Sequence, residues 1–472
     1  MANKNISRRQ ALLLGSKLAA AAALGGAVRL RAQGGPTREF NVRDHGAAGD
    51  GTTLDTMAIQ RAIDAAAAAG AGSRVLVPGG RRYLVGALEL RGAIDFHLAD
   101  DAELLVSGRP EDIGPGGAVL AAHGVRGLRL SGTGRINGRA REFMDHYDAA
   151  DEWWRPKPFR PRLAVLTGCR DLEVRDLTFL DAPGWTLHLA GCAGVLVDAI
   201  RIRNELDVPN CDGIDPDHCR DVEIKNCHIT CGDDAIVVKT SRALAAYGGS
   251  ENIRVHDCVL ETQDAGLKIG TETVGDIRGV RFERCEIRGS SRGCGIQLRD
   301  GGNVSDVLFR DLTFTASLHS APWWGRGEAV SFTAVPRTPG AKIGKISGVR
   351  VENVTGRAEN SVRISGCAES RISDVALANV AVTLDRWTKY PGGVWDNRPT
   401  SAVPGLEPHG TPGIHVRFAD RVALDRCRVG WGANCPDYFT HALEAHDVSA
   451  LTWPNFTGDA AHPGRDAAVA VR

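Results

Sequence analysis

A nine-residue pattern recurs down much of the chain and limits the folds open to it. In each copy, alternating apolar positions lead to a polar turn residue and then to a second apolar pair. The copies are Asp171–Phe179, Gly194–Ile202, Asp221–Ile229, Asn252–Leu260, Gly279–Ile287 and Asp306–Phe314, with later copies from Gly348, at Asp374–Val382 and at Arg421–Val429. The first six copies begin 23, 27, 31, 27 and 27 residues apart. Alternation with a period of two predicts β-strands, and self-similarity at this interval predicts stacked units that share one core.

Short strands with Gly and Asn turns, without intervening helical patterns, favour an all-β fold, a right-handed parallel β-helix or solenoid. Leucine-rich repeats have similar periods, but their leucine-asparagine signature is missing, and a propeller needs longer blades. Residues Thr56–Ala69 show helical spacing of apolar residues and end at Gly70, so we expect a short helix that caps the first end of the solenoid. Three insertions, Phe143–Arg162, Leu318–Lys342 and Thr388–Pro412, are expected to wall a cleft.

Acidic and basic residues are equal in number, and the N-terminus has the features of an export signal. Acidic and basic residues number 57 each, so no global field predicts a nucleic-acid or membrane partner. Ser7–Leu12 resembles a twin-arginine signal and precedes an apolar run at Leu18–Ala27 that is too short to span a bilayer. We therefore expect residues 1–33 to be an export signal, 34–472 to form one β-helix domain, and the protein to be periplasmic or extracellular.

The cysteines follow the repeat. Twelve cysteines in an exported protein ordinarily suggest disulfides. Cys227, Cys258, Cys285 and Cys427 occupy the same position of the repeat, which is expected of small buried residues stacked in a core. Neighbouring thiols could still pair, so the sequence leaves their oxidation state open. The paired spacing that indicates zinc is missing.

Two clusters of carboxylates lie close to one repeat apart. Asn210–Asp215 reads Asn-Cys-Asp-Gly-Ile-Asp and Gly232–Asp234 reads Gly-Asp-Asp, and each runs into a β-type stretch. Asp212 and Asp233 are 21 residues apart, so their side chains are expected on neighbouring rungs about 5 Å apart. Crowded carboxylates repel each other, which raises the pKa of one and keeps it protonated near neutral pH. Hydrolysis of a glycosidic bond needs such a pair, one acid and one ionised base.

Other interpretations of these aspartates remain open. Asp-Gly and Asn-x-Asp are also common turn chemistry between strands, and for Asp215 and Asp217 this explanation is as good as a functional one. Clustered carboxylates also suit a hard cation such as calcium.

The chain resembles the polygalacturonases of glycoside hydrolase family 28. Asn210–Asp215 is similar to the family's Asn-Thr-Asp motif with its trailing Gly-Ile-Asp, and Gly232–Asp234 matches its Gly/Gln-Asp-Asp. The opening motif within Asn41–Thr52 and the segment Arg160–Arg162 are similar as well. The opening motif alone is shared with related lyases and epimerases.

The resemblance implies a mechanism and a substrate. Asp233 would be the general acid, and Asp212 and Asp234 would position and deprotonate the attacking water. The anomeric carbon would be inverted without a metal or other cofactor, with acid and base about 6.5–9.5 Å apart. The substrate would be an α-linked, galacturonate-containing pectic poly- or oligosaccharide.

Two motifs depart from the family pattern. Where the family has Gly-His-Gly, this chain has Asp264-Ala265-Gly266, so Ala265 replaces the histidine. Where the family has Arg-Ile-Lys, it has Gln297-Leu298-Arg299. Those family residues tune the acid and hold the sugar carboxylate, so we expect exo-action or a non-standard specificity.

Cations and an aromatic residue near the acids are candidates for substrate binding. Lys239, Lys268 and Arg299 recur at intervals of 29 and 31 residues, and strand parity turns all three outward beside the acids. Such cations can bind a uronate carboxylate, and a tryptophan can stack on a sugar ring. The predicted substrate-binding residues are Lys239, Lys268, Gln297, Arg299, Asn210 and Trp324.

Two rival functions fit the same fold. A lyase or epimerase would abstract a proton beside a uronate, with Lys or Arg as base and calcium as electrophile. A non-catalytic glycan-binding β-helix would hold intact oligosaccharide without turnover. The first rival predicts an unsaturated product that a chelator abolishes, and the second predicts no product. The oligomeric state stays open.

Overall fold

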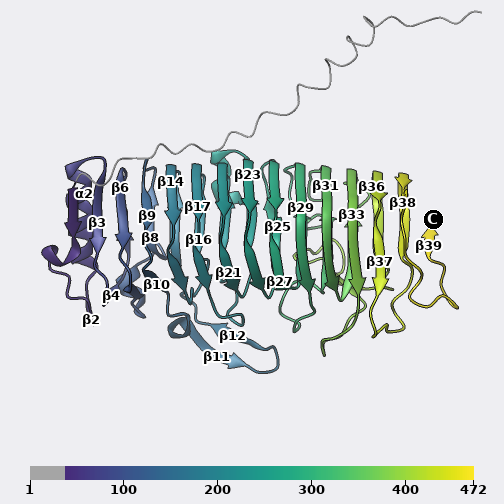
Figure 1. Ribbon diagram of the computed structural model, residues 1–472, viewed down its shortest axis with the longest axis horizontal. Coiled ribbons are helices and arrows are strands. Elements are labelled where there is room, and N and C mark those ends of the chain that lie inside the picture. The colour runs from purple at the N-terminus through teal and green to yellow at the C-terminus, as the bar shows by residue number, and fades with distance from the viewer. Residues whose placement is uncertain (1–37) are drawn as a thin grey trace, which may run out of the picture.

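The computed structural model describes residues 38–472, so the predicted export signal lies outside the described residues. In this range, 35 strands form one continuous parallel sheet wound into a right-handed helix. Its rungs stack along the long axis of the molecule, from β1 (Arg38–Asn41) at one end to the C-terminus at the other (Figure 1). The predicted all-β parallel β-helix is confirmed.

Each rung contributes strands to three faces. The first face carries β5 (Leu88–Glu89), β8 (Ala118–His123), β13 (Arg162–Thr167), β16 (Leu187–Ala190), β19 (Ile214–Asp217), β22 (Ile236–Thr240), β25 (Ala265–Thr273), β28 (Arg292–Leu298), β30 (Glu328–Ala334), β32 (Asn360–Ser365) and β39 (Val469–Val471). The second face carries β1, β3 (Ser73–Val77), β6 (Ile94–Leu98), β9 (Arg129–Ser131), β14 (Arg170–Arg175), β17 (Ala193–Asp198), β20 (Arg220–Lys225), β23 (Ser250–His256) and β26 (Ile277–Glu283).

The third face carries β2 (Asp50–Leu54), β4 (Arg81–Val85), β7 (Ala102–Val106), β10 (Arg135–Asn137), β15 (Thr178–Leu180), β18 (Arg201–Arg203), β21 (His228–Cys231), β24 (Val259–Thr262), β27 (Glu286–Ser290) and β37 (Arg428–Trp431). Five long strands bend between faces: β29 (Val304–Ala316), β31 (Ile346–Ala358), β33 (Ile372–Leu384), β36 (Ile414–Asp425) and β38 (Leu443–Thr452). All these strands pair in parallel with the next rung.

The nine-residue pattern corresponds to one strand of the second face, a turn and one strand of the third face. The turn residue adopts a left-handed backbone, with φ 64° at Asp176 and 55° at Asn226. Asp and Asn tolerate this conformation better than most residues, which explains why they recur there. The alternating apolar residues, such as Val174 and Phe179, are fully buried in the shared core. Periodicity in the sequence therefore specifies both the turns and the core.

Helices are few and short. The helix α2 (Thr56–Ala69) covers the first end of the solenoid, where it buries Ile59 and Ile63 and packs against β1 and β3. It ends at Gly70 with φ 97°, so the predicted capping helix is confirmed. The remaining helices are α3 (Pro110–Ile113), η1 (Val42–His45), η2 (Ala140–Phe143) and η3 (Arg242–Tyr247). None of the helices in residues 38–472 is long and apolar enough to cross a membrane.

The cysteines stack as the repeat predicts. Cys227, Cys258 and Cys285 lie on successive rungs and are buried, and so is Cys427. All twelve cysteines, which lie within the described range, are free thiols.

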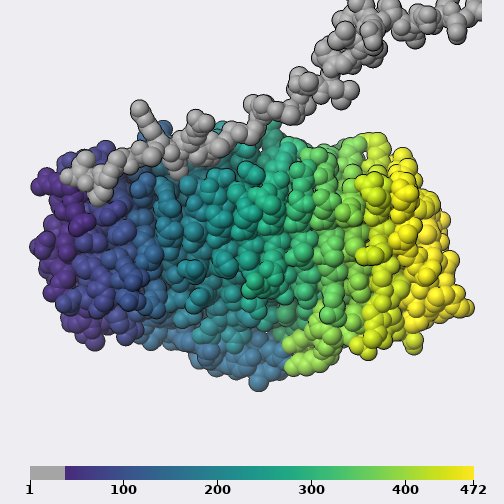
Figure 2. Space-filling view, in the orientation of Figure 1, coloured from purple at the N-terminus to yellow at the C-terminus, as the bar shows by residue number. Residues whose placement is uncertain are grey.

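The three insertions meet over one side of the solenoid. The first forms a hairpin of β11 (Met144–Asp148) and β12 (Trp153–Pro156) that projects from the body (Figure 1), and the third forms one of β34 (Val394–Asp396) and β35 (Leu406–Pro408). Two contacts join the first two insertions: the ring centroids of Trp153 and Trp323 are 5.5 Å apart, and the Ser320 hydroxyl donates to the carbonyl of Asp151 at 2.6 Å. Lys389 and Tyr390 of the third insertion bind Glu152 of the first. Figure 2 shows blue atoms of the first insertion beside yellow-green atoms from later in the chain.

Candidate active site

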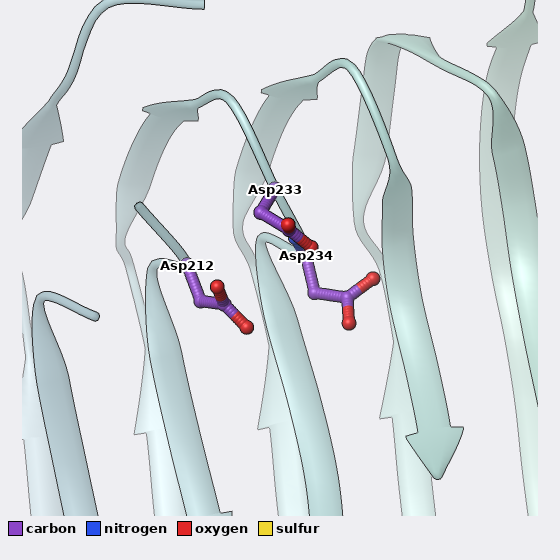
Figure 3. Close-up of side chains that lie close together, drawn as sticks. All are labelled: Asp212, Asp233 and Asp234. Atoms are coloured by element: carbon purple, nitrogen blue, oxygen red, sulfur yellow. The ribbon is translucent and has the colours of Figure 1, made fainter. Parts of the chain in front are cut away.

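Three aspartates come together where two strands of the first face begin. Asp212 lies two residues before Ile214 of β19, and Asp234 lies two residues before Ile236 of β22; these isoleucines are register partners. Asp212 therefore lies one rung from Asp233 and Asp234 (Figure 3). One carboxylate oxygen from each of the three lies within 4.8 Å of the others.

Glycines allow the rungs to approach this closely. A Cβ at Gly213 would lie 2.3 Å from the carbonyl oxygen of Ala235, and one at Gly232 would lie 2.2 Å from that of Val208. Real side chains cannot occupy such positions, so both motifs need glycine beside the acid. The Asp-Gly and Gly-Asp-Asp sequences thus follow from the packing of adjacent rungs.

Two buried lysines pair with the acids. Nζ of Lys239 lies 3.2 Å from Oδ2 of Asp212 and 2.9 Å from Oδ1 of Asp215. Nζ of Lys268 lies 2.7 Å from Oδ2 of Asp234. Both lysines face outward on the first face, as strand parity predicts, but their ammonium groups are engaged by carboxylates.

Asp233 lies in a strongly perturbed environment. Part of its side chain keeps contact with solvent, yet the surrounding protein desolvates the carboxyl. Burial, together with the charges of Asp212 and Asp234, raises the pKa of Asp233 to about 8, although Lys268 opposes the shift. Burial also raises the pKa of Asp212 above its ordinary value and that of Asp215 to about 6. Crowded, poorly solvated carboxyls retain a proton near neutral pH.

Asn210 holds the carboxyl of Asp233 in place. Its backbone N–H and its Nδ2 both donate to Oδ2 of Asp233 at 3.3 Å. The N–H of Asp234 donates to Oδ1 of Asp233 at 2.9 Å. The predicted substrate-binding Asn210 thus contacts an acid directly.

The other predicted binding residues lie under the insertions. Arg299 follows the last residue of β28 and is fully buried; it donates to the Asn397 carbonyl at 3.1 Å and to Oγ1 of Thr333 at 3.0 Å. Among the described residues its side-chain hydrogen bonds go to its own strand, to β30 and to the third insertion, and none goes to the three acids. Nε2 of Gln297 reaches the Arg398 carbonyl at 3.4 Å, and Trp324 is half-buried, its carbonyl accepting from Ser291.

Sequence reasoning missed a buried arginine, Arg292, which lies two rungs beyond Asp233 and Asp234. Arg292, in register with Ala265, has nitrogens 3.3 Å from Asp264, 3.6 Å from Glu328 and 3.7 Å from Asp396. Asp264 could have been found, because it is a third acid at the rung interval. Nothing in the local pattern marks Arg292, whose partners come from distant segments.

Asp215 and Asp217 are buried side chains and not simple turn residues. Asp215 pairs with Lys239, and Oδ1 of Asp217 accepts from the N–H of Ser241 at 2.8 Å. Trp185, which the sequence did not single out, lies with its ring centroid 3.8 Å from Nζ of Lys239.

The three aspartates are also the one group among residues 38–472 whose ligand atoms are close enough to hold a cation. A metal there would have to displace or tolerate Lys239 and Lys268, which already neutralise two of the carboxylates. The donor set with its two ammonium groups therefore fits acid–base chemistry better than metal binding.

A solenoid face that holds paired buried carboxyls at a rung boundary fits the class of enzymes that hydrolyse glycosidic bonds. The model of glycosyl hydrolases family 28 matches residues 70–390, and that of the rhamnogalacturonase A/epimerase, pectate lyase-like family matches residues 39–91. The chain belongs to glycosyl hydrolases family 28 and is a glycosidase. The resemblance seen in the motifs is confirmed.

Several relatives span most of the chain. A probable polygalacturonase of Vitis vinifera is 28% identical over 373 residues, which cover 72% of this chain and 73% of that protein. An exopolygalacturonase structure from Thermotoga maritima has 20% identity and a TM-score of 0.68, over 85% of this chain and 93% of that chain. A family 28 exopolygalacturonase of Yersinia enterocolitica has 19% identity and a TM-score of 0.66, over 90% and 79%. At these identities, the structural likeness shows the fold.

Proposed function

We propose that the protein hydrolyses α-linked, galacturonate-containing pectic poly- or oligosaccharides. The observation that carries this proposal is the close group of Asp212, Asp233 and Asp234, in which burial raises the pKa of Asp233 to about 8. The polygalacturonases among its relatives support the substrate class.

In the proposed mechanism, Asp233 is the general acid, because its raised pKa keeps it protonated at neutral pH. Asp212 and Asp234 orient the attacking water, and Asp234 is the carboxyl that we propose deprotonates it, because burial raises the pKa of Asp212 well above its ordinary value. Nζ of Lys268 lies 2.7 Å from Oδ2 of Asp234 and orients that carboxylate. Lys239 and Lys268 would also offer positive charge to a uronate carboxylate.

Inversion of the anomeric carbon is part of the proposal. Inverting enzymes separate the two carboxyl groups by about 6.5–9.5 Å, and retaining enzymes by about 5–5.5 Å. The nearest oxygens of this cluster lie within 4.8 Å, and that closest approach alone does not favour inversion. Proton NMR of the first product formed gives the anomer directly: a β-anomer from an α-linked substrate supports inversion, and an α-anomer overturns it.

Exo-action follows from the insertions. The third insertion covers the first face beyond the acids, where its Asn397 and Arg398 carbonyls accept from Arg299 and Gln297. All three insertions also contact one another, which supports the proposal that they close one end of the face to a long polymer. We therefore propose attack at a chain end.

We also propose that the protein is exported, with residues 1–33 as a twin-arginine-type signal, and acts in the periplasm or outside the cell on its glycan, without a nucleic-acid or membrane partner. N-terminal sequencing of the exported protein tests the signal. A mature chain that still begins at Met1 would overturn it.

The substrate proposal is tested by incubation with a panel of homogalacturonan, rhamnogalacturonan and substituted oligosaccharides. We expect products that gain one water per cleavage by mass spectrometry, without ultraviolet absorbance from a new double bond. Unsaturated products would instead indicate a lyase, an alternative that the pectate lyase-like match over residues 39–91 supports. Binding without any product would favour a glycan-binding role.

A further inference from the structure

Arg160 ties together the segments around the acids without touching them. Its Nη1 donates to the carbonyl of Pro209 at 2.6 Å and to that of Pro183 at 3.2 Å. Its Nη2 donates to Oδ1 of Asn210 at 2.9 Å. One guanidinium therefore fixes the first residue of the first acidic motif, using the fork geometry that only arginine offers.

The contact with Arg160 decides which way the Asn210 amide points. A side-chain amide has one accepting and one donating end, and the two are interchanged by a flip. Because Oδ1 of Asn210 accepts from Arg160, its Nδ2 must face Asp233, where it lies 3.3 Å from Oδ2. With the amide flipped, two oxygens would face each other, which would repel once Asp233 is ionised. Asn210 also has a left-handed backbone, with φ 56°, so its segment needs an anchor.

Arg160 also adds a positive charge near the acid. It is largely buried, and its charge acts on Asp233 and Asp212. The other ionisable groups that act on Asp233 are Asp212, Asp234, Asp264 and Lys268, with the buried thiols of Cys211 and Cys231. In this group the acids outnumber the cations. Arg160 is the cation on the loop side of Asp233, and Lys268 reaches the cluster from the sheet side.

We propose that Arg160 is a positioning residue for the general acid: it fixes the Asn210 amide so that two N–H groups hold Asp233 and stabilise the carboxylate left after proton donation. The inference rests on the proposed function, in which Asp233 gives its proton to the leaving oxygen. When Asp233 loses that proton, the Asn210 donors and the Arg160 charge compensate the new negative charge.

The test compares Arg160→Ala, Arg160→Lys and Arg141→Ala by the pH dependence of kcat and kcat/KM. Arg160→Ala removes the cation and frees the amide, and both changes disfavour the ionised carboxylate of Asp233. The pKa of Asp233 should rise in this variant, so the alkaline limb of the pH–activity profile should move to higher pH. At the same time kcat should fall about tenfold or more. Arg160→Lys keeps the positive charge but loses the two-pronged guanidinium. Its alkaline limb should stay near that of the wild type, while kcat falls.

Arg141→Ala is the matched control. Arg141 donates from Nε to Oε1 of Glu205 at 2.8 Å, in a largely exposed ion pair. Glu205 lies in the loop that also carries Asn210, but Arg141 itself does not contact Asn210. It should leave the pH profile unchanged. If Arg160→Ala has the kcat and the pH profile of Arg141→Ala, the proposal is wrong.

A substrate-free measurement separates this inference from the proposed function. Carbon-13 NMR titration of the Asp233 carboxyl should show a higher pKa in Arg160→Ala than in the wild type, whatever the substrate. An unchanged titration in a folded variant overturns the role of Arg160. If the wild type hydrolyses none of the pectic substrates, the proposed function is wrong, whatever the titration shows.

Discussion

At the scale of single residues, the site buries several carboxyls whose burial lowers the stability of the fold. Asp212, Asp215, Asp233, Asp234 and Asp264 all lie in or beside one rung boundary with two lysines. Burying more acids than cations costs stability, and such costs collect at functional sites.

The raised pKa of Asp233 gives a first prediction about stability. Its pKa lies near 3.8 in an ordinary setting and about 8 in the fold. The protonated form is therefore favoured by folding, and this contribution is fully present below pH 3.8 and lost as pH rises through about 8. Asp233→Asn cannot ionise, so we expect its Tm to exceed that of the wild type at pH 9 and to match it at pH 4. Calorimetry at the two pH values measures this, and equal Tm differences at both would contradict it.

The pairing of Lys268 with Asp234 gives a second prediction. Both side chains are buried, so Lys268→Met leaves a carboxyl without its partner. The loss of one member of a buried pair costs about 3–5 kcal/mol of unfolding free energy. In contrast, Lys225→Met removes a partly exposed pair with Glu223, for which about 0–1 kcal/mol is typical. Urea unfolding of both variants tests this; similar losses would mean that the buried pair has no special role.

At the scale of elements, the strands and turns follow from local sequence, whereas contacts between distant segments do not. The alternation in Asp171–Phe179 and the helical spacing in Thr56–Ala69 predicted β14, β15 and α2 because period and turn residues act locally. The sequence did not predict that the third insertion covers Arg299, because its partner Asn397 lies 98 residues further along the chain. No strand period encodes where an insertion folds back.

The packing of rungs at the acids predicts the effect of a small substitution. A Cβ at Gly213 would lie 2.3 Å from the Ala235 carbonyl, whereas one at Gly289 meets nothing closer than 4.0 Å. Gly213→Ala should therefore push β19 from β22 and lower the unfolding free energy by about 1–3 kcal/mol. Gly289→Ala should be nearly neutral. Thermal unfolding of the pair decides, and a stable, fully active Gly213→Ala would show that the rungs are looser than described.

At the scale of the whole molecule, three insertions contact one another over one side of the solenoid. The contact of Trp153 with Trp323 and the binding of Glu152 by the third insertion join parts of the chain that lie far apart in sequence. The sequence predicted that the insertions wall a cleft. The sequence could not predict that the insertions contact one another, because the repeat that specifies the stacking of the rungs does not extend into them.

Exo-action can be tested by shortening the β11–β12 hairpin around Asp148–Trp153. With this contact removed, longer chains should enter, and early products should shift from single sugar units towards longer oligosaccharides. Chromatography of the first products measures the shift, with circular dichroism as the control for folding. Unchanged product lengths in a folded variant would count against closure by the insertions.

The most direct test of the account compares hydrolysis of a pectic oligosaccharide by the wild type and by Asp233→Asn, which keeps the shape of the side chain but cannot donate its proton in the same way. Rates are followed by mass spectrometry on the substrate that the panel identifies. We predict that the wild type adds one water per bond cleaved and that the variant loses about a hundredfold or more in kcat. A variant that retains wild-type hydrolysis would contradict the assignment of Asp233 as the general acid.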